Sequence, residues 1–412
     1  MSPDVLADLD PRDARALERL ESGTAQVLPG GALAVTLSEA RAAGRPLRVK
    51  LGIDPSGTDL TLGHAVVLRK LRQFQDAGHL AVLIIGDFTG QVGDPSGKAA
   101  TRAARTAAET EANSSTYLDQ VLRILDPDRV ELRRNSEWLA SMTMTDVIQE
   151  ARELTVARLL ERDDFAQRFA SQQPISLVEF LYPLLQGYDS VAVQADVEIG
   201  GTDQTYNLLV GRDLQRAHDQ PPQVVLTLPL LEGLDGVEKM GKSLGNFVAI
   251  GEAPAQQFGK LMSLPDALIG RYLRLCTDLQ PAEIAEVEAM ASAGGPSTGA
   301  AKRRMASEIV ALYHGPAAAV VAEEHFNRVV RDRAVADDVA DAELVEGDPV
   351  HLPAALRAAG LAGSTSEARR LIDDGAVRAG GVVLAGAYDV PRSVLAGQVV
   401  QCGKRRQVRF GA

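Results

Sequence analysis

The sequence of 412 residues has few cysteines and no long apolar run, and each absence excludes a class of protein. Its two cysteines, Cys276 and Cys402, lie far apart, so neither a disulfide framework nor a zinc site is expected. No apolar run approaches the roughly 18 residues that a membrane-spanning helix needs. Residues 1–23 mix acidic and basic side chains and lack the basic-then-apolar pattern of a secretion signal, so we expect a cytoplasmic protein with no membrane partner.

The chain also lacks an overall excess of basic residues, because its formal net charge is −12. The charge is unevenly placed, however. Residues 351–412 carry nine Lys and Arg against four Asp and Glu, a net charge of +5, which leaves −17 on the rest of the chain. A basic module on an acidic body is the pattern expected when one end of a protein binds a polyanion.

Two common phosphate-binding motifs are missing from residues 47–99. No GxGxxG follows the first predicted strand, and the segment GDPSGKA at 93–99 is one residue short of a P-loop and lacks its Ser or Thr. The segment nevertheless predicts a βαβ unit: an alternating strand at 47–53, a helix that begins near Gly63, and an apolar strand at 79–85. The loop before that helix gathers unpaired N–H groups and the positive end of the helix dipole, which favours phosphate binding.

The order of patterns along the chain predicts several domains. The main one is of the α/β class, a Rossmann-like doubly wound parallel sheet at 47–250 with a helical insertion at about 105–190. The remaining predicted parts are a helical lead-in at 1–46, an α-helical domain at 251–330, an acidic linker at 331–350 and a small α+β module at 351–412. The capping box Ser364-Thr365-Ser366-Glu367 predicts the start of a helix in that last module.

Two short motifs lie at suitable places for nucleotide chemistry. Thr61-Leu62-Gly63-His64 opens the predicted helix and resembles the "HIGH" signature of class I aminoacyl-tRNA synthetases. Lys239-Met240-Gly241-Lys242-Ser243 follows a Gly-rich loop and resembles their second signature, KMSKS. Two lysines three positions apart on a mobile loop can close over a triphosphate and offset the charge of the leaving pyrophosphate.

Other segments predict a small-molecule pocket. Tyr182, Gln186 and Asp189 share one face of a predicted helix that is rich in Leu, so they need polar partners, which a ligand can supply. Gly201 at the end of a predicted strand allows another molecule close to the backbone, and Asp203 behind it can accept hydrogen bonds from a ribose.

The C-terminal module resembles an S4 RNA-binding domain, and the whole chain resembles the bacterial tyrosyl-tRNA synthetases. The resemblance implies a homodimeric tyrosine-tRNA ligase that activates L-tyrosine with ATP and Mg²⁺ and then transfers tyrosyl to tRNA(Tyr). It implies no tightly bound cofactor and no protein metal site. The dimer contact would lie in the insertion, and the helical domain would lie on the anticodon side.

The resemblance also implies roles for individual residues. Catalysis would depend on Thr61, His64, Lys239 and Lys242. The phenolic hydroxyl of tyrosine would bind Asp189, and the other tyrosine contacts would be Asp54, Asp94, Tyr182, Gln186 and Gln204. ATP would bind Ser56, Gly63, His64, Lys98, Arg102, Gly201, Asp203, Lys239, Lys242 and Ser243. RNA phosphates would bind Arg357, Arg369, Arg370 and Arg378.

Three positions depart from the family pattern, and two alternative functions stay open. Thr61 replaces the first His of its signature, Gly241 replaces a Ser, and Lys50 stands where many relatives have a Tyr beside the substrate's hydroxyl. One alternative is activation of tryptophan, or another nucleotidyl transfer, against which Asp189 and the S4-like module argue. The other is an RNA-binding protein that has lost amino-acid activation, against which Asp203 and the two signature lysines argue.

Overall fold

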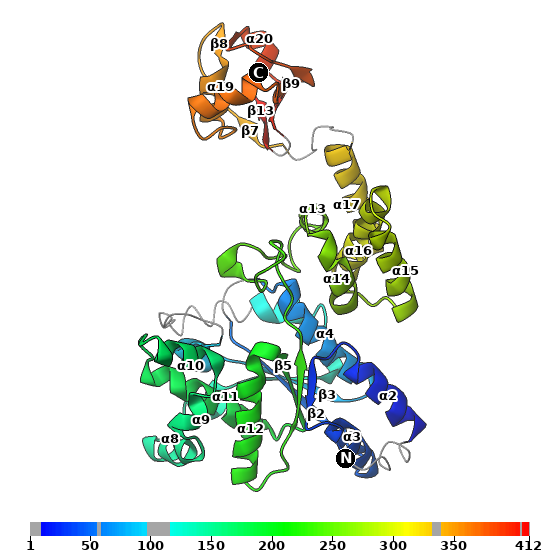
Figure 1. Cartoon of the computed structure of the whole chain (residues 1–412), viewed down its shortest axis with the longest axis vertical. Coiled ribbons are helices and arrows are strands. Elements are labelled where there is room, and N and C mark those ends of the chain that lie inside the picture. Colours follow the sequence, from blue (N-terminus) through cyan, green and yellow to red (C-terminus); the bar gives the residue numbers. More distant parts are fainter. Residues whose placement is uncertain (1–9, 56–58, 97–115, 332–338, 404–405, 412) are drawn as a thin grey trace. The chain divides into compact units, whose positions relative to one another are not determined.

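The structure is a computed structural model that describes residues 10–55, 59–96, 116–331, 339–403 and 406–411. The chain forms two compact units, Met1–Ala319 and Val320–Ala412 (Figure 1). Among the described helices, none has both the length and the apolar composition that would let it cross a membrane.

A six-stranded sheet with the order β1-β6-β5-β2-β3-β4 forms the centre of the first unit. Its strands are β1 (Gln26–Leu28), β2 (Arg48–Ile53), β3 (Leu80–Ile85), β4 (Val130–Arg134), β5 (Val197–Gly201) and β6 (Val224–Leu228). Neighbouring strands run parallel except at β1, which pairs antiparallel with β6 at one edge. The strands predicted at 47–53 and 79–85 are β2 and β3.

Helices cover both faces of this sheet, as a doubly wound fold requires (Figure 1). On one side lie α2 (Pro11–Glu21), α3 (Ala32–Ala42) and α4 (Leu62–Asp76), and on the other α11 (Leu177–Val193) and α12 (Thr205–Ala217). Because β3 is covered on both faces, Ala81–Ile85 are all buried, which explains the continuous apolar run in the sequence.

The strand order reverses beside β2. The chain proceeds from β2 outward to β3 and β4, then returns to the opposite side of β2 as β5 and continues to β6. In sheets of this kind, ligands bind in the crevice at the carboxyl ends of the strands where the order reverses. A ligand site is therefore expected at the carboxyl ends of β2 and β5.

Two expectations about this unit need correction. The lead-in at 1–46 is not purely helical, because β1 completes one edge of the sheet. The region expected to be a helical insertion supplies strand β4 at the other edge, where Leu132 alternates with the charged Glu131 and Arg133. Between β4 and the long helix α11 its helices are short, namely α7 (Ser136–Leu139), α8 (Met144–Glu150), α9 (Val156–Leu159) and α10 (Asp163–Ala170).

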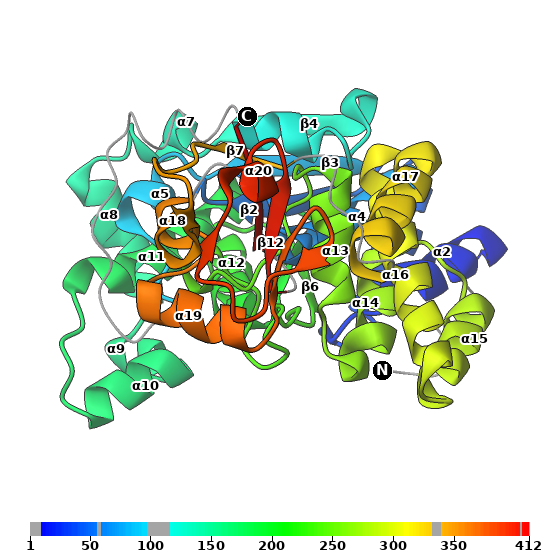
Figure 2. The same ribbon diagram turned by 90° about the horizontal axis from the view of Figure 1, so that it is seen from above.

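The segment predicted to be a helical domain consists of helices and short turns. These helices are α13 (Pro254–Met262), α14 (Ile269–Cys276), α15 (Pro281–Ser292), α16 (Pro296–His314) and α17 (Pro316–Phe326). Pro254, Pro281 and Pro296 occupy first-turn positions, where a missing N–H costs no helical hydrogen bond. Helices α14, α15 and α16 pack against one another (Figure 1 and Figure 2).

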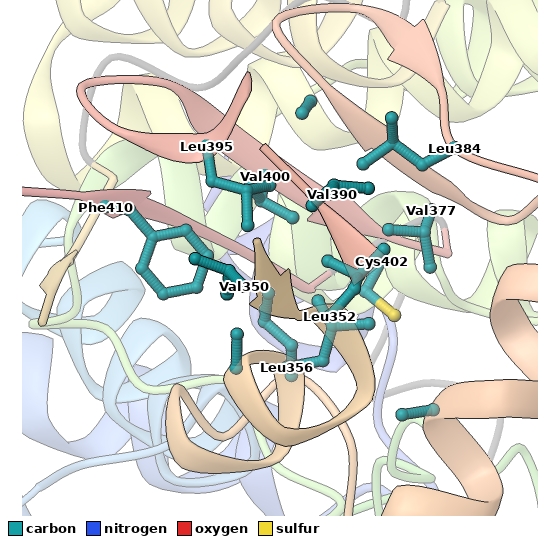
Figure 3. Packing of buried hydrophobic residues seen from close by; sticks show 14 of the residues in the cluster. Val350, Leu352, Leu356, Val377, Leu384, Val390, Leu395, Val400, Cys402 and Phe410 are labelled. Atoms are coloured by element: carbon teal, nitrogen blue, oxygen red, sulfur yellow. The ribbon is translucent and has the colours of Figure 1, made fainter. Parts of the chain in front are cut away.

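The C-terminal unit has its own sheets and core. Its elements are β7 (Asp341–Ala342), β8 (Val350–His351), α18 (Leu352–Ala358), α19 (Thr365–Asp373), β9 (Val377–Ala379), β10 (Val382–Val383), β11 (Asp389–Val390), α20 (Arg392–Leu395), β12 (Val399–Cys402) and β13 (Arg406–Phe410). Figure 3 shows Leu352 and Leu356 of α18 packed with side chains of the strands, including Val400 and Phe410. Ser364 caps α19 as predicted, since its hydroxyl accepts the Glu367 N–H.

The predicted linker at 331–350 is only partly a linker. Strand β7 pairs in parallel with β13, and Leu344 belongs to the apolar core of the C-terminal unit. Leu344 and Val350 are buried in this acidic stretch, although the overall charge of the segment favoured a linker. The unit therefore begins before residue 351.

Candidate active site

A cavity of about 400 Å³ lies at the carboxyl ends of β2 and β5. It is lined by the predicted residues Asp54, Thr61, Gly63, His64, Asp94, Tyr182, Gln186, Asp189, Gly201, Asp203, Gln204, Lys239, Lys242 and Ser243. Residues from five separate parts of the chain thus meet at one place. Ser56, Lys98 and Arg102, also predicted to bind ATP, lie outside the described residues.

The first signature positions a neutral histidine at the start of α4. The Nδ1 atom of His64 accepts the backbone N–H of Thr61 at 3.2 Å and lies 2.8 Å from the Thr61 hydroxyl. Burial, together with the nearby charges of Lys242 and Lys239, lowers the pKa of His64 to about 4. The imidazole is therefore neutral at pH 7, and because Nδ1 accepts, its proton lies on Nε2, which can donate to a ligand.

Thr61, which replaces the first His of the signature, has a structural role in the site. Its side chain is 1 % exposed and its hydroxyl faces the ring of His64, so it orients the second histidine of the signature. A backbone bridge pairs Thr61 with Ala249, and flanking hydrogen bonds join Leu62 to Val248 and Ile250 to Leu60. The stretch after the second signature is thereby fixed to the first.

The two signature lysines have different partners. Lys239 forms an ion pair with the Asp203 carboxylate and is about half exposed. Lys242 donates to the phenolic oxygen of Tyr117 at 2.6 Å and to the backbone carbonyl of Asp59 at 2.9 Å. Both ammonium groups border the cavity, on the side where His64 lies.

A buried carboxylate lies on α11. Asp189 is 3 % exposed and accepts the indole N–H of Trp138 at 2.9 Å and the side-chain N–H of Asn135 at 3.3 Å. Burial raises the pKa of Asp189 to about 7, against the opposing effects of Lys50, Trp138 and Asn135. When it is ionised, the Asp189 carboxylate is a strong hydrogen-bond acceptor, and the nearby donors and Lys50 stabilise its charge only in part.

A second carboxylate, Asp54, follows β2 and is held by two hydroxyls. Tyr182 donates to its Oδ2 at 2.9 Å and Thr89 to its Oδ1 at 2.8 Å. Burial and the nearby Asp54 raise the pKa of Tyr182 well above its usual range, so its hydroxyl stays protonated. A Cβ at Gly86 would lie 1.9 Å from the Asp54 Oδ1, so only glycine allows this arrangement. Close by along α11, the buried Gln186 Oε1 accepts no hydrogen bond from any described residue.

A closed ring of hydrogen bonds orients Asp94. Arg162 donates from one nitrogen to Asn207 at 3.1 Å and from the other to the Ser96 hydroxyl at 3.2 Å. Asn207 then donates to Gln204 at 2.9 Å, Gln204 donates to Asp94 Oδ2 at 2.9 Å, and the Ser96 N–H donates to Asp94 Oδ1 at 2.9 Å. A buried guanidinium therefore sets the orientation of both amides and of the carboxylate.

Lys50, the third departure from the family pattern, contributes to the fold and not to the pocket. Its side chain is fully buried, does not line the cavity, and forms an ion pair with Glu198 at 2.8 Å. It also donates to the Ser190 hydroxyl at 2.8 Å and to the Gln186 carbonyl at 3.0 Å. Lys50 thus attaches α11 to strands β2 and β5 and has no contact with the pocket interior.

Sequence reasoning missed several residues that shape the site, namely Asn135, Trp138, Tyr117 and Arg162. A signal existed for two of them. Asn135 and Trp138 follow the carboxyl end of β4, the sheet edge at which the cavity opens. Recognising β4 as a strand would have placed them there.

The C-terminal unit presents the predicted RNA-binding arginines on its surface. Arg357, Arg369 and Arg370 are exposed, and Arg378 of β9 is partly exposed. The Arg369 guanidinium lies 5.8 Å from the centre of the Tyr388 ring. In the described part of the chain, no cluster of His, Cys, Asp and Glu has the composition to hold a metal ion, and the free Cys276 and Cys402 are both buried.

The fold and the two signatures that meet at its cavity define a class I aminoacyl-tRNA synthetase. The family model described as tRNA synthetases class I (W and Y) matches residues 42–331. A tyrosine–tRNA ligase of Moorella thermoacetica is 50% identical over 98% of this chain and 97% of its own length. One of Desulfotalea psychrophila is 48% identical over 95% and 97%. A truncated mitochondrial tyrosyl-tRNA synthetase of Aspergillus nidulans has a TM-score of 0.63 at 20% identity, covering 79% of this chain and 96% of that one.

The chain belongs to the family of tyrosine–tRNA ligases. The two ligases cited are aligned with both units of the chain, whereas the family model ends at residue 331, before the sheets of the C-terminal unit.

Proposed function

We propose that the chain activates L-tyrosine with ATP and transfers the tyrosyl group to tRNA(Tyr) through the cavity at the ends of β2 and β5. The observation that carries this proposal is Asp189, a buried carboxylate with two neutral donors and remaining acceptor capacity. A phenolic hydroxyl is a donor of matching size. A site that hydrogen-bonds a hydroxyl strongly rejects the analogue without it, a rule for which tyrosyl-tRNA synthetase is itself the standard example.

The amino group of tyrosine would lie at the other end of the pocket. Asp94, the acceptor Gln186 Oε1 and the hydroxyl of Tyr182 border that end, and an ammonium group has three N–H donors to offer them. Asp54 lies behind Tyr182 and adds negative charge. Acceptors and carboxylates at one end and Asp189 at the other would bind the zwitterion in one orientation.

ATP would occupy the part of the cavity between the two signatures. The ribose hydroxyls would donate to Asp203, which now holds Lys239, so nucleotide binding would release that lysine toward the phosphates. Glycine at 201 leaves the Asp203 carboxylate in place for the ribose, because a Cβ there would lie 2.7 Å from Asp203 Oδ1. His64, with its proton on Nε2, and Lys242 would bind the phosphate chain, and Mg²⁺ would enter with the nucleotide, bound by its phosphates.

In the first step, a carboxylate oxygen of tyrosine attacks the α-phosphorus of ATP and the bond to pyrophosphate breaks, giving tyrosyl-adenylate. In the second, a terminal ribose hydroxyl of tRNA attacks the tyrosyl carbonyl and AMP leaves. No residue forms a covalent bond. Positioning and charge stabilisation by Lys239, Lys242 and His64 supply the catalysis, as is usual for phosphoryl chemistry.

Exposed apolar side chains support a homodimer as the working form. Six of them lie within one stretch of the sequence, residues 144–178, in helices α8 to α11: Met144, Ile148, Val156, Phe169, Leu177 and Val178. Contiguous exposed apolar groups mark interaction surfaces, and these six are the candidates for one in this part of the chain. Sedimentation equilibrium should give twice the chain mass of 43.8 kDa, and a monomer at micromolar concentration would refute the dimer.

Aminoacylation in vitro tests the proposed function. Purified protein, ATP, Mg²⁺ and total bacterial tRNA are incubated with labelled tyrosine, phenylalanine or tryptophan. The proposal predicts acid-precipitable label with tyrosine alone. Label with tryptophan would reassign the pocket, and binding of tRNA without any charging would support an RNA-binding protein that has lost activation.

A further inference from the structure

Tyr117 contacts both signatures of the active site, although neither motif contains it. It lies in the helical segment 116–121 and is fully buried. Its hydroxyl accepts the Lys242 ammonium at 2.6 Å, and that ammonium lies 5.1 Å from the centre of the ring. The same ring meets the imidazole of His64 edge-on, with 6.4 Å between the ring centres.

Among the described residues, the contacts of Lys242 occupy two of its three N–H donors. An ammonium group has three N–H bonds, of which one is directed to the Tyr117 oxygen and one to the Asp59 carbonyl. Because both acceptors are neutral, the positive charge remains uncompensated by them. The third N–H and the full charge are thus available to a phosphate oxygen at the cavity, while two hydrogen bonds fix the position of the group.

Lys239 provides the contrast. Its ammonium is paired with the Asp203 carboxylate, which offsets its charge, and its side chain is about half exposed, so its position is less fixed than that of Lys242. The two lysines of this short loop therefore differ in how firmly their ammonium groups are positioned for a phosphate. An ammonium group that is already held in position loses less conformational entropy when it stabilises the charge that develops on the pyrophosphate.

We propose that Tyr117 is a positioning residue for adenylate formation, which holds Lys242 of the second signature against His64 of the first. Tyr117 does not line the cavity and acts only through these two neighbours. The inference rests on the proposed function, since it assigns Lys242 to the departing pyrophosphate.

The test is Tyr117→Phe, which keeps the ring and removes the hydroxyl. Tyr313→Phe is the matched control, because Tyr313 is a tyrosine of the same unit whose buried hydroxyl bonds to no described residue. Single-turnover formation of tyrosyl-adenylate is measured at saturating tyrosine and ATP. Loss of a hydrogen bond to a charged group predicts a rate about 10- to 100-fold lower for Tyr117→Phe and an unchanged rate for Tyr313→Phe.

A double-mutant cycle separates positioning from general damage to the fold. Tyr117→Phe should have no further effect on the rate in a Lys242→Ala background, and tyrosine affinity should stay unchanged in all variants. An equal loss in both backgrounds, or a wild-type rate in Tyr117→Phe, would overturn the inference while leaving the proposed function intact. Failure of the wild-type protein to form adenylate would overturn the proposed function itself.

Discussion

Replacing Asp189 by Asn tests the assigned end of the tyrosine pocket with almost no change in volume. Trp138 donates to one carboxylate oxygen and Asn135 to the other, so an amide could accept only from one of them and would direct its N–H₂ group at the second donor. The phenolic hydroxyl of tyrosine would then lose its charged acceptor. A hydrogen bond to a charged group contributes about 1.5–3 kcal/mol, so kcat/KM for tyrosine should fall about 10- to 150-fold.

A comparison of tyrosine with phenylalanine shows whether the fall in kcat/KM comes from the lost hydrogen bond to the phenolic hydroxyl. Phenylalanine has no hydroxyl to lose, so its kcat/KM should change little and the preference for tyrosine over phenylalanine should shrink by the same factor. Asp213→Asn on the outer side of α12 is a suitable control, because Asp213 pairs there only with the half-exposed Arg158 and Arg216 among the described residues. Equal losses for tyrosine and phenylalanine in Asp189→Asn would refute the assignment, since they would indicate general damage to the pocket.

The raised pKa of Asp189 adds a dependence on pH. In the empty site, burial raises this pKa to about 7, so lowering the pH protonates the acceptor. A phenol that donates to the carboxylate binds the deprotonated form, and tyrosine affinity should therefore fall as the pH drops below 7, by at most about tenfold per unit. Trp138 is the one tryptophan of the chain and touches Asp189, so its fluorescence reports binding directly. In Asp189→Asn the affinity should not change between pH 6 and pH 8, and a retained slope would assign the titration to another group.

Three further predictions concern other parts of the molecule. Lys242→Ala should slow adenylate formation by about 100-fold or more while tyrosine affinity, followed by fluorescence, stays near wild type; rapid single-turnover adenylation would exclude the role given to this lysine. Lys50→Met should lower the free energy of unfolding by about 3–5 kcal/mol in urea titrations, because Glu198 would remain buried without its partner, and Lys50→Met with Glu198→Leu should recover most of the loss; no recovery would mean that the pair is not the cause. Truncation after Arg331 removes the whole C-terminal sheet and core, and should spare adenylation while weakening tRNA binding and its dependence on salt; unchanged aminoacylation would contradict an RNA-binding role for that unit.

The sequence was sufficient to predict the core of the catalytic unit, for clear physical reasons. The apolar run at 79–85 has few alternatives to a strand covered on both faces, and a Gly-His pair after a turn begins a helix readily. Tyr182, Gln186 and Asp189 recur at helical spacing, so their common face followed from periodicity alone. Because the carboxyl ends of parallel strands share one edge, segments distant in the sequence could be assigned to one crevice.

The parts that could not be predicted depend on contacts between distant segments. Strand β1 is only three residues long, and its existence depends on pairing with β6. Nothing adjacent to Lys50 in the sequence indicates that Glu198 will neutralise it inside the fold. In the sequence Arg162 has the features of a surface residue between short helices, yet its hydrogen bonds to Asn207 and Ser96 complete the ring that orients Asp94. Positioning residues of this kind have no motif, since their role is set by the tertiary structure.

Amino-acid-dependent exchange of pyrophosphate into ATP, measured without tRNA, tests the central claim most directly. Tyrosine, phenylalanine and tryptophan are compared in parallel with the full-length protein and with Asp189→Asn. We expect exchange with tyrosine alone in the wild-type protein and a strong loss of tyrosine-dependent exchange in the variant. Exchange with tryptophan, or with none of the three amino acids, would contradict the assignment of the pocket and of the chemistry.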